Sequence, residues 1–315
     1  MKIFVKDLKE GNSVTDEVFS IEEIQQHKTR NQNLYYRLVL QDRSGEIAAK
    51  IWQDNFDNCD IRNLNPGDVV KVSGDISRYN GKLQFIIKKL NKTEDYDITD
   101  LLQASDKNLN VMYKRIQEEI TKLKNKNLKL LLNNIFKDET FVKRYKRTPA
   151  AEKVHHDFIG GLMEHTLEMI DTAKPIFEYY KEADRSLVIA GIILHDIGKV
   201  YELKVKNTSI IRTTAGKLIG HITQGVELVK SYLPKNFPKK LWMKLEHIIL
   251  SHQHQVQFEY GSPIKQATIE AAIVHAVDYA SSHVRQFQKA IKLGEGQNKG
   301  FSDYQRWIET QVYLD

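Results

Sequence analysis

Ser186-Leu-Val-Ile-Ala-Gly-Ile-Ile-Leu194 is an apolar run that leads directly into the adjacent pair His195-Asp196. Gly198 and Lys199 follow, and a glycine just past an apolar segment is a usual helix end. The sequence therefore predicts a buried helix that presents an imidazole and a carboxylate at its C-terminus. Burial of a polar group without a partner costs roughly 2–7 kcal/mol. A bound metal ion is the expected partner, and a helix-end ion pair is the alternative.

Further candidate ligands lie on both sides of this pair, each on its own predicted helix. His165 lies near the start of one helix, His221 opens another, His252 ends a third and Asp278 lies within a fourth. Helices of a bundle can project such residues into one shared cavity. Nitrogen and oxygen donors without thiolate suit Mn, Mg, Co, Fe or Zn. The sequence therefore predicts a divalent metal site inside a helical bundle.

These residues resemble the signature of the HD-domain phosphohydrolase superfamily, which runs His, then His-Asp, then Asp. A narrower resemblance, to the YhaM-type 3′→5′ exoribonucleases, covers nearly the whole chain, and proteins of that type join an N-terminal OB-fold to an HD domain. The segments that carry it are Pro149-Ala-Ala, His155-His156, Ile159-Gly-Gly-Leu-Met-Glu-His165, Ile193-Leu-His-Asp-Ile-Gly-Lys199, Gly220-His221-Ile, Leu250-Ser-His252 and Tyr260-Gly-Ser-Pro263.

The resemblance implies a site for two divalent ions, with manganese favoured. It also implies catalytic roles for Asp196 and for Lys199, which would hold non-bridging phosphate oxygens unless it is only a solvated helix end. One departure is Gln253, where the family pattern has a second histidine, and His254 is the candidate substitute. The implied ligands are His165, His195, Asp196 and Asp278 for the first ion, and Asp196, His221 and His252 for the second.

The first 95 residues carry strand and turn patterns that resemble a nucleic-acid-binding OB-fold. Residues 35–40 and 46–52 read as strands, Asn80-Gly81 as a hairpin turn, and residues 21–27 as helical. Bases stack on aromatic rings for about 1–3 kcal/mol each, and basic residues follow the phosphates. Half of each barrel strand points inward, so core positions for Trp52 and Phe85 are the alternative. The predicted nucleic-acid contacts here are Tyr35, Arg37, Trp52, Arg78, Tyr79, Lys82 and Phe85.

The predicted fold is therefore multidomain, with an all-β OB-fold barrel at 1–95 and an all-α HD-domain helical bundle at 150–315. Between them, residues 96–149 read as a linker followed by basic helices. Residues 101–149 carry a net charge of +7, against +6 for the whole chain. This basic region is either a surface that binds a polyanion or a solvated helix surface. A small hairpin is expected around Asn207-Thr-Ser209. His156, Lys204 and Arg212 are further predicted nucleic-acid contacts.

Composition limits the remaining possibilities. Cys59 is the single cysteine, which excludes a disulfide framework and a cysteine-ligated zinc site. The first residues are too polar for a signal peptide, and no apolar run reaches the ~18–20 residues of a membrane span. We therefore expect a cytoplasmic protein with no membrane partner, whose state of homo-oligomerisation is left open.

The resulting hypothesis is a two-metal 3′→5′ exonuclease that acts on single-stranded RNA and releases 5′-mononucleotides, with its preference between RNA and single-stranded DNA left open. One alternative keeps the HD site but assigns it to free or cyclic nucleotides, which leaves the OB-fold and basic region without a purpose. A second alternative is a non-catalytic single-strand-binding accessory protein.

Overall fold

The computed structural model describes residues 2–29, 31–102, 105, 107–152, 156–206, 209–253, 261–294 and 300–314. His155 and His254 lie outside these residues. The chain divides into two compact units, residues 1–104 with 205–211 and residues 105–204 with 212–315. The predicted class, an N-terminal barrel followed by a helical region, is confirmed. Within the described ranges, no helix is long and apolar enough to cross a bilayer.

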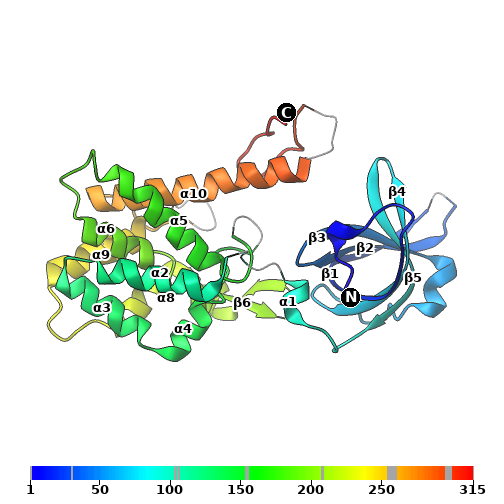
Figure 1. The fold of residues 1–315 in the computed structure, drawn as a ribbon, viewed down its shortest axis with the longest axis horizontal. Helices are drawn as coiled ribbons and strands as arrows, with labels where there is room; N and C mark the ends of the chain where they lie inside the picture. The colour runs from blue at the N-terminus through cyan, green and yellow to red at the C-terminus, as the bar shows by residue number, and fades with distance from the viewer. Residues whose placement is uncertain are drawn as a thin grey trace. The chain divides into compact units, whose positions relative to one another are not determined.

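The first unit is built on a closed barrel with strand order β1-β2-β3-β5-β4 (Figure 1). β3 and β5 pair in parallel, and the other neighbours pair antiparallel. Asn80 and Gly81, between β4 and β5, have φ of 49° and 78°, as the predicted hairpin turn requires. The strands are β1 (Ser13–Lys28), β2 (Leu34–Asp42), β3 (Gly45–Trp52), β4 (Val69–Tyr79) and β5 (Lys82–Lys92).

Two expectations for the barrel are corrected. Residues 21–27 were expected to be helical, but they belong to β1, whose pairing with β2 shifts register between Ile21 and Glu23. Such a bulge interrupts the two-residue alternation of a strand, so this stretch does not show a clear strand pattern. Phe85 is fully buried and packs edge-on against Phe19, with ring centroids 6.1 Å apart. It is therefore a core residue and cannot stack on a base.

The second unit consists mainly of helices. The predicted hairpin strands are confirmed as β6 (Leu203–Lys206) and β7 (Ser209–Arg212), although residues 205–211 group with the first unit. Asn207 and Thr208 lie outside the described residues. α1 (Ile98–Leu101), within the predicted linker, belongs to the first unit. The remaining helices are α2 (Leu109–Thr121), α3 (Lys126–Phe136), α4 (Glu139–Tyr145), α5 (Gly161–Ile176), α6 (Arg185–Leu194), α7 (Lys199–Glu202), α8 (Thr214–Ser231), α9 (Lys239–Ser251) and α10 (Ile269–Gly294).

Helix α6 is the centre of this bundle, because every residue from Ser186 to Leu194 is buried. The helix begins where the Asp184 side chain accepts hydrogen bonds from the backbone N–H groups of Ser186 and Leu187. It packs against α5, α9 and α10. The apolar run thus carries the pair that follows it into the bundle interior.

Candidate functional site

The structure brings the predicted metal ligands of five helices together. His165 lies on α5, His195 and Asp196 follow α6, and Asp278 lies on α10. All but Asp278, whose side chain is 13% exposed, are almost completely buried. The remaining two candidates, on α8 and at the end of α9, are His221 and His252.

His221 is positioned by a break inside α8. Gly220 has φ 76° and ψ 161°, so the helix stops there and starts again at His221. Only glycine adopts such a conformation without strain. His252 is the C-cap of α9. The sequence prediction that one histidine opens a helix and the other ends one is confirmed in both cases.

One group of possible metal ligands consists of His165, His195 and Asp278. Nε2 of His165 lies 3.2 Å from Oδ1 of Asp278 and 3.3 Å from Nε2 of His195. The donor atoms of the three residues are close enough to bind one ion together. The family resemblance implies this same set for the first ion, with Asp196 as its fourth member.

A second group surrounds Asp196. Its Oδ1 atom lies 3.3 Å from Nε2 of His221 and 3.5 Å from Nε2 of His252. All three atoms are buried, and none has a hydrogen-bond partner of good geometry. Buried polar atoms are nearly always paired, so three that face one another without hydrogen bonds indicate a place for a cation. Nitrogen and carboxylate donors without thiolate fit a divalent ion of the Mn, Mg, Co, Fe or Zn class.

The far sides of two imidazole rings are held by backbone carbonyls. Nδ1 of His195 lies 2.8 Å from the Ile192 carbonyl oxygen, and Nδ1 of His252 lies 2.8 Å from the Ile249 carbonyl oxygen. A carbonyl oxygen only accepts, so Nδ1 must carry the proton in both rings. In the neutral rings, Nε2 then offers its lone pair to the site.

The other two rings are held by side chains that the sequence analysis did not identify. Nδ1 of His221 lies 3.2 Å from Oε2 of Glu202, which is buried. Nδ1 of His165 lies 3.1 Å from Oγ of Ser281, which in turn donates to Glu168 at 3.1 Å. Carboxylates behind metal-binding histidines orient the ring and raise its basicity. Thus all four histidines are fixed with Nε2 toward the same interior space.

Lys199 is buried beside the carboxylate that joins the two groups. Its Nζ atom donates to Oδ2 of Asp196 at 2.6 Å, which leaves Oδ1 toward His221 and His252. Burial alone would raise the pKa of Asp196, but the charges of Lys199 and His195 hold it well below its ordinary value. The carboxylate is therefore ionised across the physiological pH range.

The histidine pKa values follow from burial and from the neighbouring carboxylates. Burial lowers the pKa of His165 and of His252, which favours their neutral, metal-binding forms. For His195, burial also acts downward, but the charge of Asp196 outweighs it and raises the pKa. A cation in the site competes with that proton, because a ligand must be deprotonated to bind.

Other predicted residues lie around this centre. His156 is buried, with its ring centroid 5.5 Å from that of His165 and its Nε2 3.5 Å from Glu168. Arg212 is held by Glu152 at 3.3 Å and Glu202 at 3.9 Å. Lys204 is exposed on β6. Their contacts with nucleic acid stay predictions.

The barrel carries an aromatic cluster formed by residues that the sequence singled out. The rings of Tyr35 and Trp52 lie 5.2 Å apart, and His27 stacks on Tyr35 at 5.5 Å. Lys50, which the sequence analysis missed, lies over the rings of Tyr35, Trp52 and Tyr79 at 6.0, 5.4 and 4.8 Å. Its central place among the rings comes from pairing across strands, which sequence spacing does not display.

The predicted basic residues of the barrel differ in their surroundings. Arg37 is exposed on β2, where it pairs across the strand with Lys50. Lys82 is exposed at the start of β5. Arg78 lies 3.2 Å from Glu10 and donates to the Gly81 carbonyl oxygen at 2.7 Å. Arg78 therefore supports the hairpin turn, and its predicted contact with nucleic acid stays untested.

Comparisons with known proteins agree with both units. Residues 13–93 match the family model of an OB-fold nucleic acid binding domain, and residues 162–282 match that of the HD domain. The second match contains every candidate ligand. Three relatives carry the same description, 3′-5′ exoribonuclease YhaM. The Bacillus velezensis protein is 32% identical over 94% of both chains. The Bacillus subtilis and Bacillus licheniformis proteins are 34% and 33% identical over 85% of both chains.

The similarity to these relatives extends over most of their length. It therefore includes the barrel, the helical unit and the candidate ligands in their order along the chain. The chain belongs to the YhaM family of 3′-5′ exoribonucleases.

Proposed function

We propose that this protein is a metal-dependent 3′→5′ exonuclease that degrades single-stranded RNA and releases 5′-mononucleotides. The observation that carries the proposal is the convergence of four histidine Nε2 atoms and two carboxylates inside the helical unit. The description of the relatives supports the direction and the RNA substrate. Single-stranded DNA is a second substrate of the same chemistry.

The two groups of donors are suited to two divalent ions, with Asp196 between them. His165, His195 and Asp278 would hold one ion, and His221 and His252 would hold the other. Manganese is the favoured metal, and the donor set also suits Mg, Co, Fe or Zn. Gln253 follows His252, and its buried Oε1 atom has no hydrogen-bond partner. Whether this oxygen takes the place of the second histidine of the family pattern is part of the proposal.

Bound metal ions would activate water and offset the charge that develops on the phosphate oxygens during hydrolysis. The protein's own residues supply the preorganisation. The partners on Nδ1 prevent the four rings from rotating away, and Lys199 holds Asp196 by its Oδ2 atom. In this arrangement Lys199 acts first as a positioning residue for Asp196. Contact between Lys199 and a phosphate oxygen remains part of the proposal.

The barrel supplies a surface for bases that are not in a duplex. The rings of Tyr35, Trp52 and Tyr79 lie around the ammonium group of Lys50. Aromatic rings bind bases by stacking without strong sequence preference, and lysines bind the phosphates. An exonuclease that shortens many different RNAs needs this kind of sequence-tolerant recognition.

The products of digestion test the proposal. The wild-type protein with Mn²⁺ is incubated in parallel with single-stranded RNA, single-stranded DNA, nucleoside triphosphates and cyclic dinucleotides, and the products are separated by chromatography. We expect 5′-mononucleotides from the RNA and intact small nucleotides. If the small nucleotides are hydrolysed while the RNA stays intact, the metal centre acts on free or cyclic nucleotides instead of RNA. Binding of RNA without turnover of any substrate would indicate an accessory protein.

A further inference from the structure

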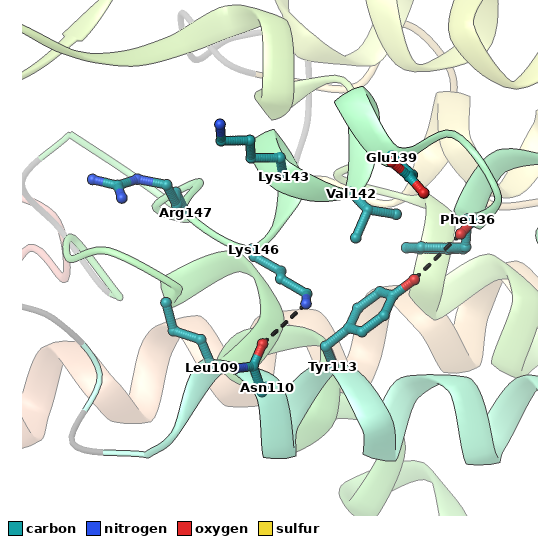
Figure 2. Close-up of a pocket in the computed structure, with 9 residues that line it drawn as sticks. All are labelled: Leu109, Asn110, Tyr113, Phe136, Glu139, Val142, Lys143, Lys146 and Arg147. Atoms are coloured by element: carbon teal, nitrogen blue, oxygen red, sulfur yellow. Dashed lines mark hydrogen bonds between the residues drawn. The ribbon is translucent and has the colours of Figure 1, made fainter.

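A concave surface lies on the helical unit, between α2 and α4 (Figure 2). Its volume is about 460 Å³, within the roughly 300–1,000 Å³ range of ligand sites. Phe136 of α3 and Val142 form part of its apolar lining, and Leu109, Asn110 and Tyr113 of α2 line one wall. We call this surface the α2–α4 pocket.

Three cationic side chains line the α2–α4 pocket from the end of α4. Lys143, Lys146 and Arg147 are spaced i, i+3 and i+4, so they lie on one face of the chain. Lys146 points toward α2, where its Nζ atom donates to Asn110 at 3.1 Å and lies 4.3 Å from the Tyr113 ring centroid (Figure 2). Glu139 is the single acidic residue of the lining.

The positive charge of the pocket is available to a ligand. Among the described residues, Lys143, Lys146 and Arg147 make no ion pair with a carboxylate, whereas Arg115 and Lys174 nearby on α2 and α5 are paired with Asp171. Lys143 and Arg147 are also exposed. Three cations around one concavity attract an anion with several charges, because their mutual repulsion is relieved when phosphates come between them.

The end of α4 also contacts α5 and α7, the helices that carry His165 and Lys199. The Thr148 carbonyl oxygen, next to Arg147, accepts from the Leu162 N–H at 3.0 Å, one turn before His165 on α5. The Cζ atom of Arg144 lies 5.7 Å from the ring centroid of Tyr201 on α7. Tyr201 comes two residues after Lys199 in the sequence. The pocket therefore adjoins the helices that build the metal centre, and it lies wholly within the helical unit.

We propose that the α2–α4 pocket binds the phosphodiester backbone of the single-stranded RNA substrate, independently of the barrel. This inference rests on the proposed function, since the RNA that reaches the metal centre is the polyanion presented to these cations. Lys143, Lys146 and Arg147 contact successive phosphates, and Tyr113 with Asn110 keeps Lys146 in place. Phosphate contacts of this kind set affinity and register without reading sequence.

The test compares two full-length double variants that lose the same charge. Lys143→Gln/Arg147→Gln removes two exposed cations of the pocket. Lys239→Gln/Lys240→Gln removes two exposed cations at the start of α9, which packs against α6, α8 and α10. Binding of a fluorescent single-stranded RNA is measured by anisotropy in EDTA at several salt concentrations. Thermal unfolding confirms that both variants fold, and RNA degradation by wild type with Mn²⁺ tests the proposed function separately.

We expect the pocket variant to bind RNA roughly tenfold more weakly at 0.1 M salt, with a slope of log K against log salt that is about 1.4 shallower, since each phosphate contact on a single strand contributes about 0.7. The α9 variant should keep the wild-type slope. Equal Kd values and slopes for the two variants would overturn the proposal. The binding of AMP to wild type and to the pocket variant is measured in the same buffer. Weaker AMP binding by the pocket variant with unchanged RNA binding would also overturn the proposal, and would assign the pocket to free nucleotides.

Discussion

The carboxylate of Glu202 lies behind the ring of His221, with Oε2 3.2 Å from Nδ1. Both side chains are almost fully buried, and Glu202 also lies 3.9 Å from Nε of Arg212. Glu202 ends α7, just after His195-Asp196, whereas His221 comes after the hairpin and the break in α8. The contact thus joins the two ends of the segment 202–221 and fixes the His221 ring that faces Asp196.

Replacement of this carboxylate should weaken metal binding. Glu202→Gln keeps the size of the side chain but removes the charge that raises the basicity of His221. We expect about tenfold weaker Mn²⁺ affinity for one of two sites, the lower end of the usual effect of such partners. Isothermal titration of the metal-free protein measures it. Glu152→Gln, which also removes a partner of Arg212 but touches no candidate ligand, is the control. Equal affinities in the two variants would contradict the assigned role.

Lys199 should stabilise the metal-free protein more than the metal-bound one. Its Nζ atom is the cation nearest to buried Asp196, so Lys199→Met leaves that carboxylate uncompensated. Loss of one partner of a buried ion pair costs about 3 kcal/mol or more. We expect that loss in urea unfolding without metal, and a smaller one with Mn²⁺, which replaces the missing charge. Lys217→Met, at an exposed position on α8, is the matched control. An equal loss with and without metal would exclude this explanation.

The pH dependence of stability should report Glu168. Burial alone would raise its pKa, but the neighbouring His156 and the hydrogen-bonded Arg285 hold the pKa at about 2, below the ordinary 4.5. A lowered pKa means that the folded state favours the carboxylate, so its contribution is complete above pH 4.5 and disappears as the pH falls toward 2. The melting temperature of Glu168→Gln should therefore lie below that of wild type at pH 7, by a margin that shrinks below pH 4.5. A constant margin would mean that Glu168 does not titrate as expected.

Substitutions in the barrel should separate binding from stability. Trp52→Ala removes a ring of the aromatic cluster and should weaken RNA binding by about 1–3 kcal/mol. Phe85→Ala removes a buried ring and should instead cost about 3–5 kcal/mol of folding free energy. Fluorescence anisotropy and urea unfolding measure the two effects. Equal RNA affinity of Trp52→Ala and wild type would show that the aromatic cluster does not contact the RNA.

The candidate ligands could be predicted from sequence because each depends on local patterns. An apolar run that ends in His195-Asp196 needs no long-range information to be recognised as a buried helix end. Gly220 before His221 likewise indicates a break in a helix. Glu202 and Ser281 could not be found in this way, because what makes them important is contact with rings that lie 19 and 116 residues away along the chain.

The errors in the barrel have the same origin. Alternation along a strand shows that half the side chains face inward, but not which half, so Phe85 and Trp52 could not be distinguished. Residues 21–27 contain Ile21 and Ile24 at a helical spacing among strong helix formers, and the bulge in β1 disrupts the strand period. Pairing with β2 and β4 overrides this local preference.

The most direct test of the proposed function is a time course on a 5′-labelled single-stranded RNA with Mn²⁺. Wild type is compared with His195→Ala/Asp196→Ala and with wild type in EDTA. We predict a ladder that shortens one nucleotide at a time from the 3′ end in wild type alone. Intact RNA in the wild-type reaction, or the same ladder in the variant or in EDTA, would contradict a metal-dependent 3′→5′ exonuclease built on these residues.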